Sequence, residues 1–232
     1  MNKICLFALL IAVASANLAT DISNIMTPTR EYMSCLSKNV TKVILKISDK
    51  QGTINKNFLN GFIFAKDAGI STVDATVVVN DTLVPSELSA DVTAALPANF
   101  NGTVWLQVLN APTLWDRQMS QRISYLEDLV LAFQQHNLTT GIYSDANAWT
   151  SILGSPGIGS ETLDSALVWY ANNNGIQSFD DFNYAGFGTW TKPSLKNYKN
   201  YVPICYIVTT SFDYYEAETQ FKKIDQQRFL SY

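Results

Sequence analysis

Histidine, cysteine and glycine-rich phosphate motifs are scarce in this chain of 232 residues, which holds one histidine and three cysteines. The segment 154–159 (GSPGIG) is interrupted by Pro156 and lacks the spacing of a dinucleotide or P-loop site. No zinc cluster remains, and no Ser-His or Cys-His nucleophile pair is readily assembled. We therefore expect no metal and no cofactor, and His136 is interpreted as a surface residue. Carboxylates remain as the candidates for chemistry.

Basic runs and long apolar segments are also missing. The net charge of −4 gives no attraction to nucleic acid, so no nucleic-acid partner is expected. The apolar run 4–14 is too short to span a bilayer. Together with Lys3 and Ala14-Ser15-Ala16, this run predicts a signal peptide over 1–16, with an uncleaved anchor as the alternative. The mature chain is then secreted, or delivered to a lysosome-like vacuole, with no membrane span.

A secretory compartment determines how the cysteines and the Asn-x-Ser/Thr sequons are interpreted. Cys5 leaves with the signal, and Cys35 and Cys205 remain near opposite ends of the mature chain. In an oxidising compartment they suggest one disulfide, with two free buried thiols as the alternative. Four Asn-x-Ser/Thr sequons predict surface positions for N-linked glycans: Asn39, Asn80, Asn101 and Asn137.

Short apolar strands alternate with helical patterns along the chain. Strands are expected at 18–22, 42–47, 72–79, 103–109, 139–143, 166–171 and 203–209. A helix is expected at 27–38, with Thr27 as its N-cap, and a second one contains Phe58, Phe62 and Ala65 and ends at Gly69. Further helices are expected at 85–96, 119–136 and 145–153. This alternation predicts an α/β fold with a parallel sheet, either a barrel or an open doubly wound sheet. The length suits one domain over 17–212, followed by a polar helix or tail over 213–232, and we expect a monomer.

Three aspartates merit comparison as chemical groups. Asp21 ends the first strand, where chemistry collects in parallel barrels. Asp74 lies inside an apolar strand, so it is either a functional carboxylate or a hydrogen-bonded core group. Asp145 precedes a helix and is interpreted as its N-cap.

Several motifs, taken in order, resemble one family. Thr20-Asp21-Ile22-Ser23 resembles an opening Val-Asp-Val-Ser strand, and Gly141-Ile142-Tyr143-Ser144 resembles a Gly-Val-Tyr-Ser segment. Val168-Trp169-Tyr170-Ala171 and the later 188–194 (GTWTKPS) resemble Leu-Trp-Tyr-Ala and Gly-Trp-Thr-Lys-Pro. The chain is thus similar to glycoside hydrolase family 25, the secreted muramidase-type lysozymes, in their nematode and protist form. The resemblance implies a flattened, TIM-like (β/α) barrel and a peptidoglycan or related glycan partner.

The departures from that family concern its acids. The strand beginning Thr103 resembles the one that carries Asp-x-Glu, and those two positions are Gln107 and Leu109. Alternation places 105, 107 and 109 on one face, which we expect to point into the barrel. The last-strand Asp is matched to Thr209, and a family His to Asn172.

Loss of these acids predicts loss of chemistry. Leu109 has no proton for a leaving group, and losing a general acid costs roughly 10²–10⁴ in rate. The resemblance therefore implies a pseudoenzyme that binds glycan with lost or much reduced hydrolysis. The predicted glycan-binding residues are Gln107, Tyr143, Trp169, Tyr170 and Asn172. Two alternatives stay open: an active lysozyme using Asp21 and Asp74, and a non-enzymatic secreted protein that binds a partner.

Overall fold

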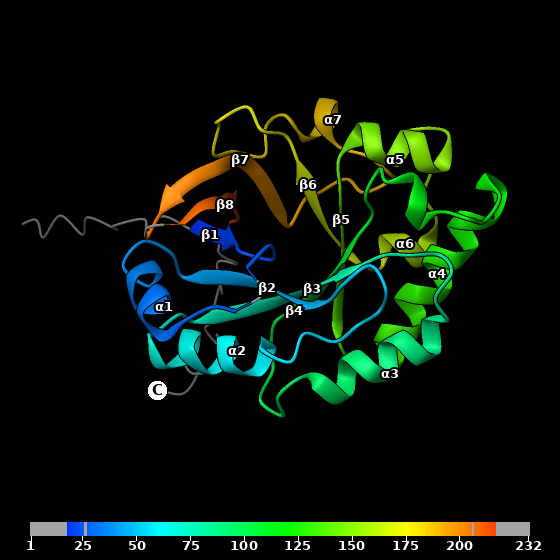
Figure 1. Cartoon of the computed structure of the whole chain (residues 1–232). Coiled ribbons are helices and arrows are strands. Elements are labelled where there is room, and N and C mark those ends of the chain that lie inside the picture. Colours follow the sequence, from blue (N-terminus) through cyan, green and yellow to red (C-terminus); the bar gives the residue numbers. More distant parts are fainter. Residues whose placement is uncertain (1–17, 26, 206, 217–232) are drawn as a thin grey trace, which may run out of the picture.

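Eight strands close into a barrel in chain order, with the helices around its outside (Figure 1). The structure, a computed structural model, describes residues 18–25, 27–205 and 207–216, with the side chains of 207–209 excepted. The predicted signal peptide over 1–16 and residues 217–232 of the predicted tail lie outside this part. No helix of the described part is long and apolar enough to cross a membrane. The predicted α/β barrel is confirmed.

Seven parallel strands and one antiparallel strand build the wall. The strands are β1 Leu18–Asp21, β2 Lys42–Ser48, β3 Thr72–Val78, β4 Thr103–Gln107, β5 Thr139–Ser144, β6 Leu167–Ala171, β7 Leu195–Ile204 and β8 Ile207–Tyr214. β8 runs antiparallel to both β7 and β1 and closes the barrel. We call the end where β1 to β6 finish the mouth, and the end where they begin the base.

Helices follow most strands and cover the outer face. They are α1 Arg30–Leu36, α2 Phe58–Asp67, α3 Pro85–Ala95, α4 Met119–Gln135, α5 Ala146–Leu153, α6 Glu161–Asp164 and α7 Phe182–Ala185, with a 3-10 turn at Pro112–Leu114. The longest, α4, buries the stripe Leu126, Leu129, Val130 and Phe133, as the spacing predicts. Asp145 is confirmed as an N-cap: its side chain accepts hydrogen bonds from the backbone of Asn147 and Ala148.

Two separate cores hold the barrel together. The larger lies between the strands and the helices, where apolar residues of both layers are excluded from water. The smaller fills the barrel interior and consists of Ala19, Ile44, Trp105, Trp169 and Leu195. Because side chains alternate along a strand, each strand supplies both cores. The interior cluster separates the mouth from the base.

Two predicted elements are corrected. Helix α1 is capped by Thr29, whose Oγ1 accepts from Tyr32 N at 3.2 Å, and not by Thr27. The single strand expected at 203–209 is two strands, β7 and β8, joined by a turn at Cys205. β7 was missed because its sequence, LKNYKNYVPI, alternates poorly, with a lysine and an asparagine buried. β8 also extends to Tyr214, two residues beyond the boundary predicted for the barrel.

The predicted disulfide between Cys35 and Cys205 is confirmed. It joins α1 to the turn between β7 and β8, across a sequence separation of 170 residues, with an S–S distance of 2.05 Å. This bond ties the closing hairpin of the barrel to its first helix. Cross-links that close long loops restrict the unfolded chain most.

Replacing both cysteines, Cys35→Ser with Cys205→Ser, is expected to lower the free energy of unfolding by about 2–5 kcal/mol. The measurement is urea denaturation followed by tryptophan fluorescence, with the reduced and alkylated parent as a matched control. An unchanged midpoint in the double variant would contradict a stabilising role for this bond.

Candidate active site at the barrel mouth

Three predicted residues meet at the barrel mouth. Asp21 ends β1 and is partly exposed, and its Oδ1 accepts a hydrogen bond from Ser23 N at 2.7 Å. Gln107 ends β4 and is buried; it lies two residues after the interior Trp105, so alternation turns it inward. Tyr143 of β5 is partly buried against the interior cluster. Acidic, amide and phenol groups therefore share this end of the barrel.

A second mouth carboxyl, Asp213, was missed by the sequence analysis. It lies in β8 as the cross-strand neighbour of Ala19 and of Asn197, and it is fully buried. Its Oδ1 accepts from Trp169 Nε1 at 3.0 Å. Residue 213 had been assigned to a tail, because the strand was expected to end at 209. Recognising Phe212-Asp213-Tyr214 as strand would have placed this acid inside the barrel.

The two mouth carboxyls perturb one another. Burial raises the pKa of Asp21, against the opposing effect of Ser23 and the positive charge of Lys46. Burial and the neighbouring Asp21 raise the pKa of Asp213 well above 3.8, against hydrogen bonds that include those of Trp169 and Asn197. Asp213 is consequently the carboxyl that holds a proton more readily.

Two buried side-chain oxygens near the mouth lack a hydrogen-bond partner among the described residues: Asp213 Oδ2 and Asn197 Oδ1. Their residues are cross-strand neighbours in β8 and β7. An ionised carboxylate oxygen only accepts, so the lack of a donor at Oδ2 agrees with the raised pKa of Asp213.

Aromatic rings form the floor of the mouth. The ring of Tyr143 lies 4.3 Å from that of Trp169, and Trp169 meets Trp105 edge-on at 5.5 Å. Burial, together with the charges of Asp21, Asp213 and Asp145, raises the pKa of Tyr143, so its phenol stays neutral. Trp169 is fully buried and supports Tyr143 from below. Of the predicted aromatic residues, Tyr143 alone is partly exposed at this face.

The expectation that residues 107 and 109 both point into the barrel is wrong for residue 109, because β4 ends at Gln107 and the alternation does not continue. Gln107 faces the interior, whereas Leu109 follows the end of β4 and packs, partly buried, against the outer core. The carbonyl oxygen of Leu109 accepts from Trp115 Nε1 at 2.9 Å. Thr209 lies in β8, and its side chain is outside the described part.

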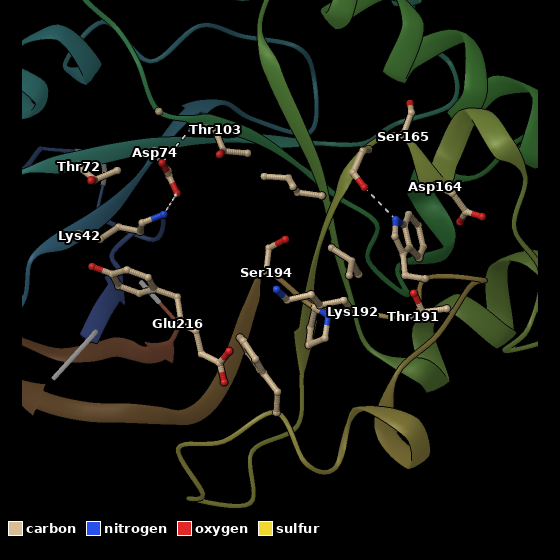
Figure 2. A pocket seen from close by; sticks show the side chains of 18 of the residues that line it. Lys42, Thr72, Asp74, Thr103, Asp164, Ser165, Thr191, Lys192, Ser194 and Glu216 are labelled. Atoms are coloured by element: carbon tan, nitrogen blue, oxygen red, sulfur yellow. Dashed lines mark hydrogen bonds and ion pairs between the residues drawn. The ribbon is translucent and has the colours of Figure 1, made fainter. Parts of the chain in front are cut away.

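Asp74 lies toward the base and not beside Asp21. Its carboxylate accepts from Lys42 Nζ at 3.1 Å, Thr103 N at 2.9 Å and Trp105 Nε1 at 3.0 Å. Lys42 and Thr103 are the first residues of β2 and β4, so this carboxylate lies at the base of the barrel (Figure 2). The contacts are those of a hydrogen-bonded core carboxyl, so the structure does not bring Asp21 and Asp74 together.

Tyr170 and Asn172 take part in a different cluster, centred on Asp181. Tyr170 Oη donates to Asp181 Oδ1 at 2.6 Å, and Asn172 Nδ2 donates to Oδ2 at 2.6 Å. The fully buried Lys196 donates to both carboxylate oxygens, at 2.9 and 2.8 Å. These contacts fasten the segment after β6 to β7, so Tyr170 and Asn172 shape the rim and do not line the interior.

The remaining candidates lie at the surface. Asn39, Asn101 and Asn137 are exposed, whereas Asn80 is partly buried and donates to Lys50 O at 2.7 Å. Whether any of them carries a glycan stays a prediction. Within 18–25, 27–205 and 207–216, no group of three or more His, Cys, Asp or Glu residues is placed to hold a metal ion.

Fold and site together define a glycosidase-type (β/α) barrel with carboxyls at its mouth. A family model described as "Lysozyme-like protein 1" matches residues 12–198. "Probable GH family 25 lysozyme 2" of Dictyostelium discoideum is 31% identical over 196 residues, covering 83% of this chain and 88% of that protein. The chain belongs to the glycoside hydrolase family 25 lysozymes, and the predicted resemblance is confirmed.

Two further comparisons agree on the barrel. "Probable GH family 25 lysozyme 3" of the same organism is 28% identical over 213 residues, 88% of this chain. The chain spans 43% of the length of that relative. The crystal structure of a bacterial lysozyme from Streptomyces coelicolor superposes with a TM-score of 0.70 at 13% identity, covering 89% of this chain and 94% of that one. At that identity the likeness shows the fold.

Asp181→Asn is expected to destabilise the protein by roughly 3–5 kcal/mol, because it leaves the buried Lys196 charge without its partner. Burial alone would raise the pKa of Asp181, but hydrogen bonds from Lys196, Tyr170 and Asn172 lower it. Its stabilising effect is therefore present above the ordinary pKa of 3.8 and is lost as the pH falls through the lower folded value. Chemical denaturation across acid pH measures both effects.

The neighbouring exposed Asp180, changed to Asn, serves as the matched control for Asp181. It removes the same charge without touching Lys196, so its unfolding midpoint should stay close to that of the parent. Equal midpoints for the two variants would show that the Lys196 contact contributes nothing.

Asp213→Asn is expected to keep or raise stability at mildly alkaline pH. A raised folded pKa means that the stabilising effect of Asp213 is full below 3.8 and is lost as the pH rises through the higher folded value. A neutral amide of the same shape removes that dependence. Thermal unfolding at several pH values measures it, beside Asp74→Asn, which breaks the Lys42 ion pair and should destabilise. A large loss of stability in Asp213→Asn at alkaline pH would mean that the ionised form is the one required.

Proposed function

We propose that this protein binds peptidoglycan, or a related glycan, at the barrel mouth, with lost or much reduced hydrolysis. We further propose that it acts after secretion or in a lysosome-like vacuole, since residues 1–16 have the pattern of a signal peptide. Membership of a lysozyme family supports a glycan as the ligand. The single observation that carries the loss of hydrolysis is the chemistry of β4, which ends in an amide where the family resemblance expects a carboxylate.

The mouth offers more groups for binding than for cleavage. Glycosidic cleavage needs a proton donor at the leaving oxygen and a carboxylate near the sugar ring. Gln107 supplies only amide hydrogen bonds, and Leu109 supplies none. Tyr143 is a neutral phenol that both donates and accepts. Such groups suit the hydroxyl and acetamido groups of a sugar.

A second candidate function is an atypical hydrolase, and it is supported by Asp21 and Asp213 instead of Asp21 and Asp74. Two carboxyls whose environments separate their pKa values form the usual pattern of an acid and its partner. Against this, Asp213 is fully buried, and one of its oxygens is taken by Trp169. The binding function therefore has the stronger support. A third candidate function is binding of a protein partner, and it would be supported if the protein had no affinity for glycan.

The first test is sedimentation of the secreted protein with insoluble peptidoglycan, beside release of reducing ends from the same material. Binding without turnover is expected. Gln107→Ala should weaken binding about tenfold, the loss of one buried hydrogen bond. Gln135→Ala, at an exposed position late in α4, is the matched control and should bind like the parent. Binding that is unaffected by Gln107→Ala would contradict use of the mouth.

The second test separates lost hydrolysis from atypical hydrolysis. If the parent cleaves peptidoglycan and both Asp21→Asn and Asp213→Asn abolish cleavage, the atypical hydrolase is correct. If the parent is inactive, the variant Gln107→Glu tests the account of the loss, because it places a carboxyl at the acid-matched position that ends β4 and faces the barrel interior. Gain of cleavage would show that the remaining mouth is sound. Absence of both binding and cleavage in the parent would favour a protein partner.

A further inference from the structure

A large open cavity lies at the base of the barrel, opposite the mouth. Its volume is about 1020 Å³, at the top of the range of about 300–1,000 Å³ for ligand sites. Its walls come from the beginnings of β2, β3 and β4 and from the segment 189–194 before β7 (Figure 2). In barrels of this type the base contributes stability and the mouth carries chemistry. A glycan bound at the mouth therefore does not explain this cavity.

One of the four sequons lies on the cavity wall. Asn101 is exposed, lines the cavity and begins Asn101-Gly102-Thr103. A Cβ at Gly102 would collide with the carbonyl oxygen of Val73, so only glycine allows this close approach to β3. Thr103 N is fixed by its hydrogen bond to Asp74 Oδ1 at 2.9 Å. The backbone that follows Asn101 is thus fixed beside β3.

Other residues that line the cavity have the chemistry of a sugar site. Apolar faces come from Phe179 and Trp190, and hydroxyl groups come from Thr191 and Ser194. Exposed Lys192 adds an ammonium donor (Figure 2). Sugars present C–H groups on their faces and hydroxyl groups at their edges, so a mixed wall of this kind accommodates both.

The other sequons lack this combination. Asn39 and Asn137 are exposed but are not among the residues that line the cavity. Asn80 is partly buried, and its amide already donates to Lys50 O. Among the four sequons, Asn101 is the one whose exposed asparagine lines this cavity.

We propose that an N-linked glycan on Asn101 occupies the base cavity, with its first N-acetylglucosamine packed against the segment 189–194. The donor is an oligosaccharide linked to a lipid diphosphate in the secretory pathway. Asn101 Nδ2 bonds to C1 of the sugar, the bond from C1 to the phosphate oxygen breaks, the lipid diphosphate leaves and the amide loses one proton. The glycan then covers Lys192 and the faces of Phe179 and Trp190. This inference rests on export of the chain and is independent of the function of the mouth.

The test uses the full chain secreted from a eukaryotic host, as the parent, Asn101→Gln and the matched control Asn39→Gln. The folded protein is treated with a peptide N-glycanase, and mass spectrometry of glycopeptides measures the rate at which each glycan is released. The Asn101 glycan should be released at least about tenfold more slowly than a glycan at Asn39 or Asn137, and equally fast after unfolding. Acetylation of Lys192 should be several-fold faster in Asn101→Gln than in the parent or in Asn39→Gln.

Three results would overturn the proposal. The first is a secreted parent in which Asn101 carries no sugar mass. The second is release of the Asn101 glycan from the folded protein as quickly as the exposed glycans. The third is reaction of Lys192 at the same rate in the parent and in Asn101→Gln. Because Asn101 is exposed, its replacement is expected to fold, and a circular dichroism spectrum like that of the parent confirms this.

Discussion

Two indole N–H groups inside the barrel fix the positions of its buried carboxyls. Trp105 Nε1 donates to Asp74 toward the base, and Trp169 Nε1 donates to Asp213 toward the mouth. The two rings meet edge-on at 5.5 Å and fill the interior between these ends. A buried carboxyl without hydrogen-bond donors is strongly unfavourable, so each indole N–H stabilises the burial of the carboxyl that it contacts. The barrel is therefore a packed core with a distinct chemical environment at either end.

The two ends differ in what the carboxyls have around them. Asp74 accepts three hydrogen bonds, one of them from Lys42, and it joins the beginnings of β2, β3 and β4. Asp213 instead faces a second acid, Asp21, and keeps one oxygen unpaired. Two neighbouring acids that repel each other lower stability, and such pairs are typical of functional sites. This contrast is what directs the functional proposal to the mouth.

Much of the fold could be predicted from the sequence because the parallel strands are apolar and the helices are amphipathic. β3 and α4 have such patterns, and their predicted bounds differ from the observed ones by a single residue. β7 could not be predicted, since Lys196 and Asn197 are buried by tertiary partners that no local pattern reveals. Because the β7–β8 hairpin was not predicted, Asp213 was not predicted to lie in the barrel.

The site was predictable only where family motifs reach it. Asp21, Gln107 and Tyr143 follow from strand ends and alternation. Tyr170 was expected near the glycan because it lies near a strand end, as Trp169 does. Neighbours on a strand face opposite sides, however, and Tyr170 bonds to Asp181 on the outer side. The pairing of Asp21 with Asp74 was wrong because Asp21 ends its strand whereas Asp74 is the third residue of β3, and parallel strands carry these two positions to opposite ends of the barrel.

The most direct test of the central claim is native mass spectrometry of the secreted parent mixed with a soluble peptidoglycan fragment. One spectrum reads both complex formation and the mass of the bound sugar. The account predicts a complex that contains the intact fragment and persists without appearance of shorter sugars. Cleavage products at the rate of an active lysozyme, or no complex at all, would contradict it.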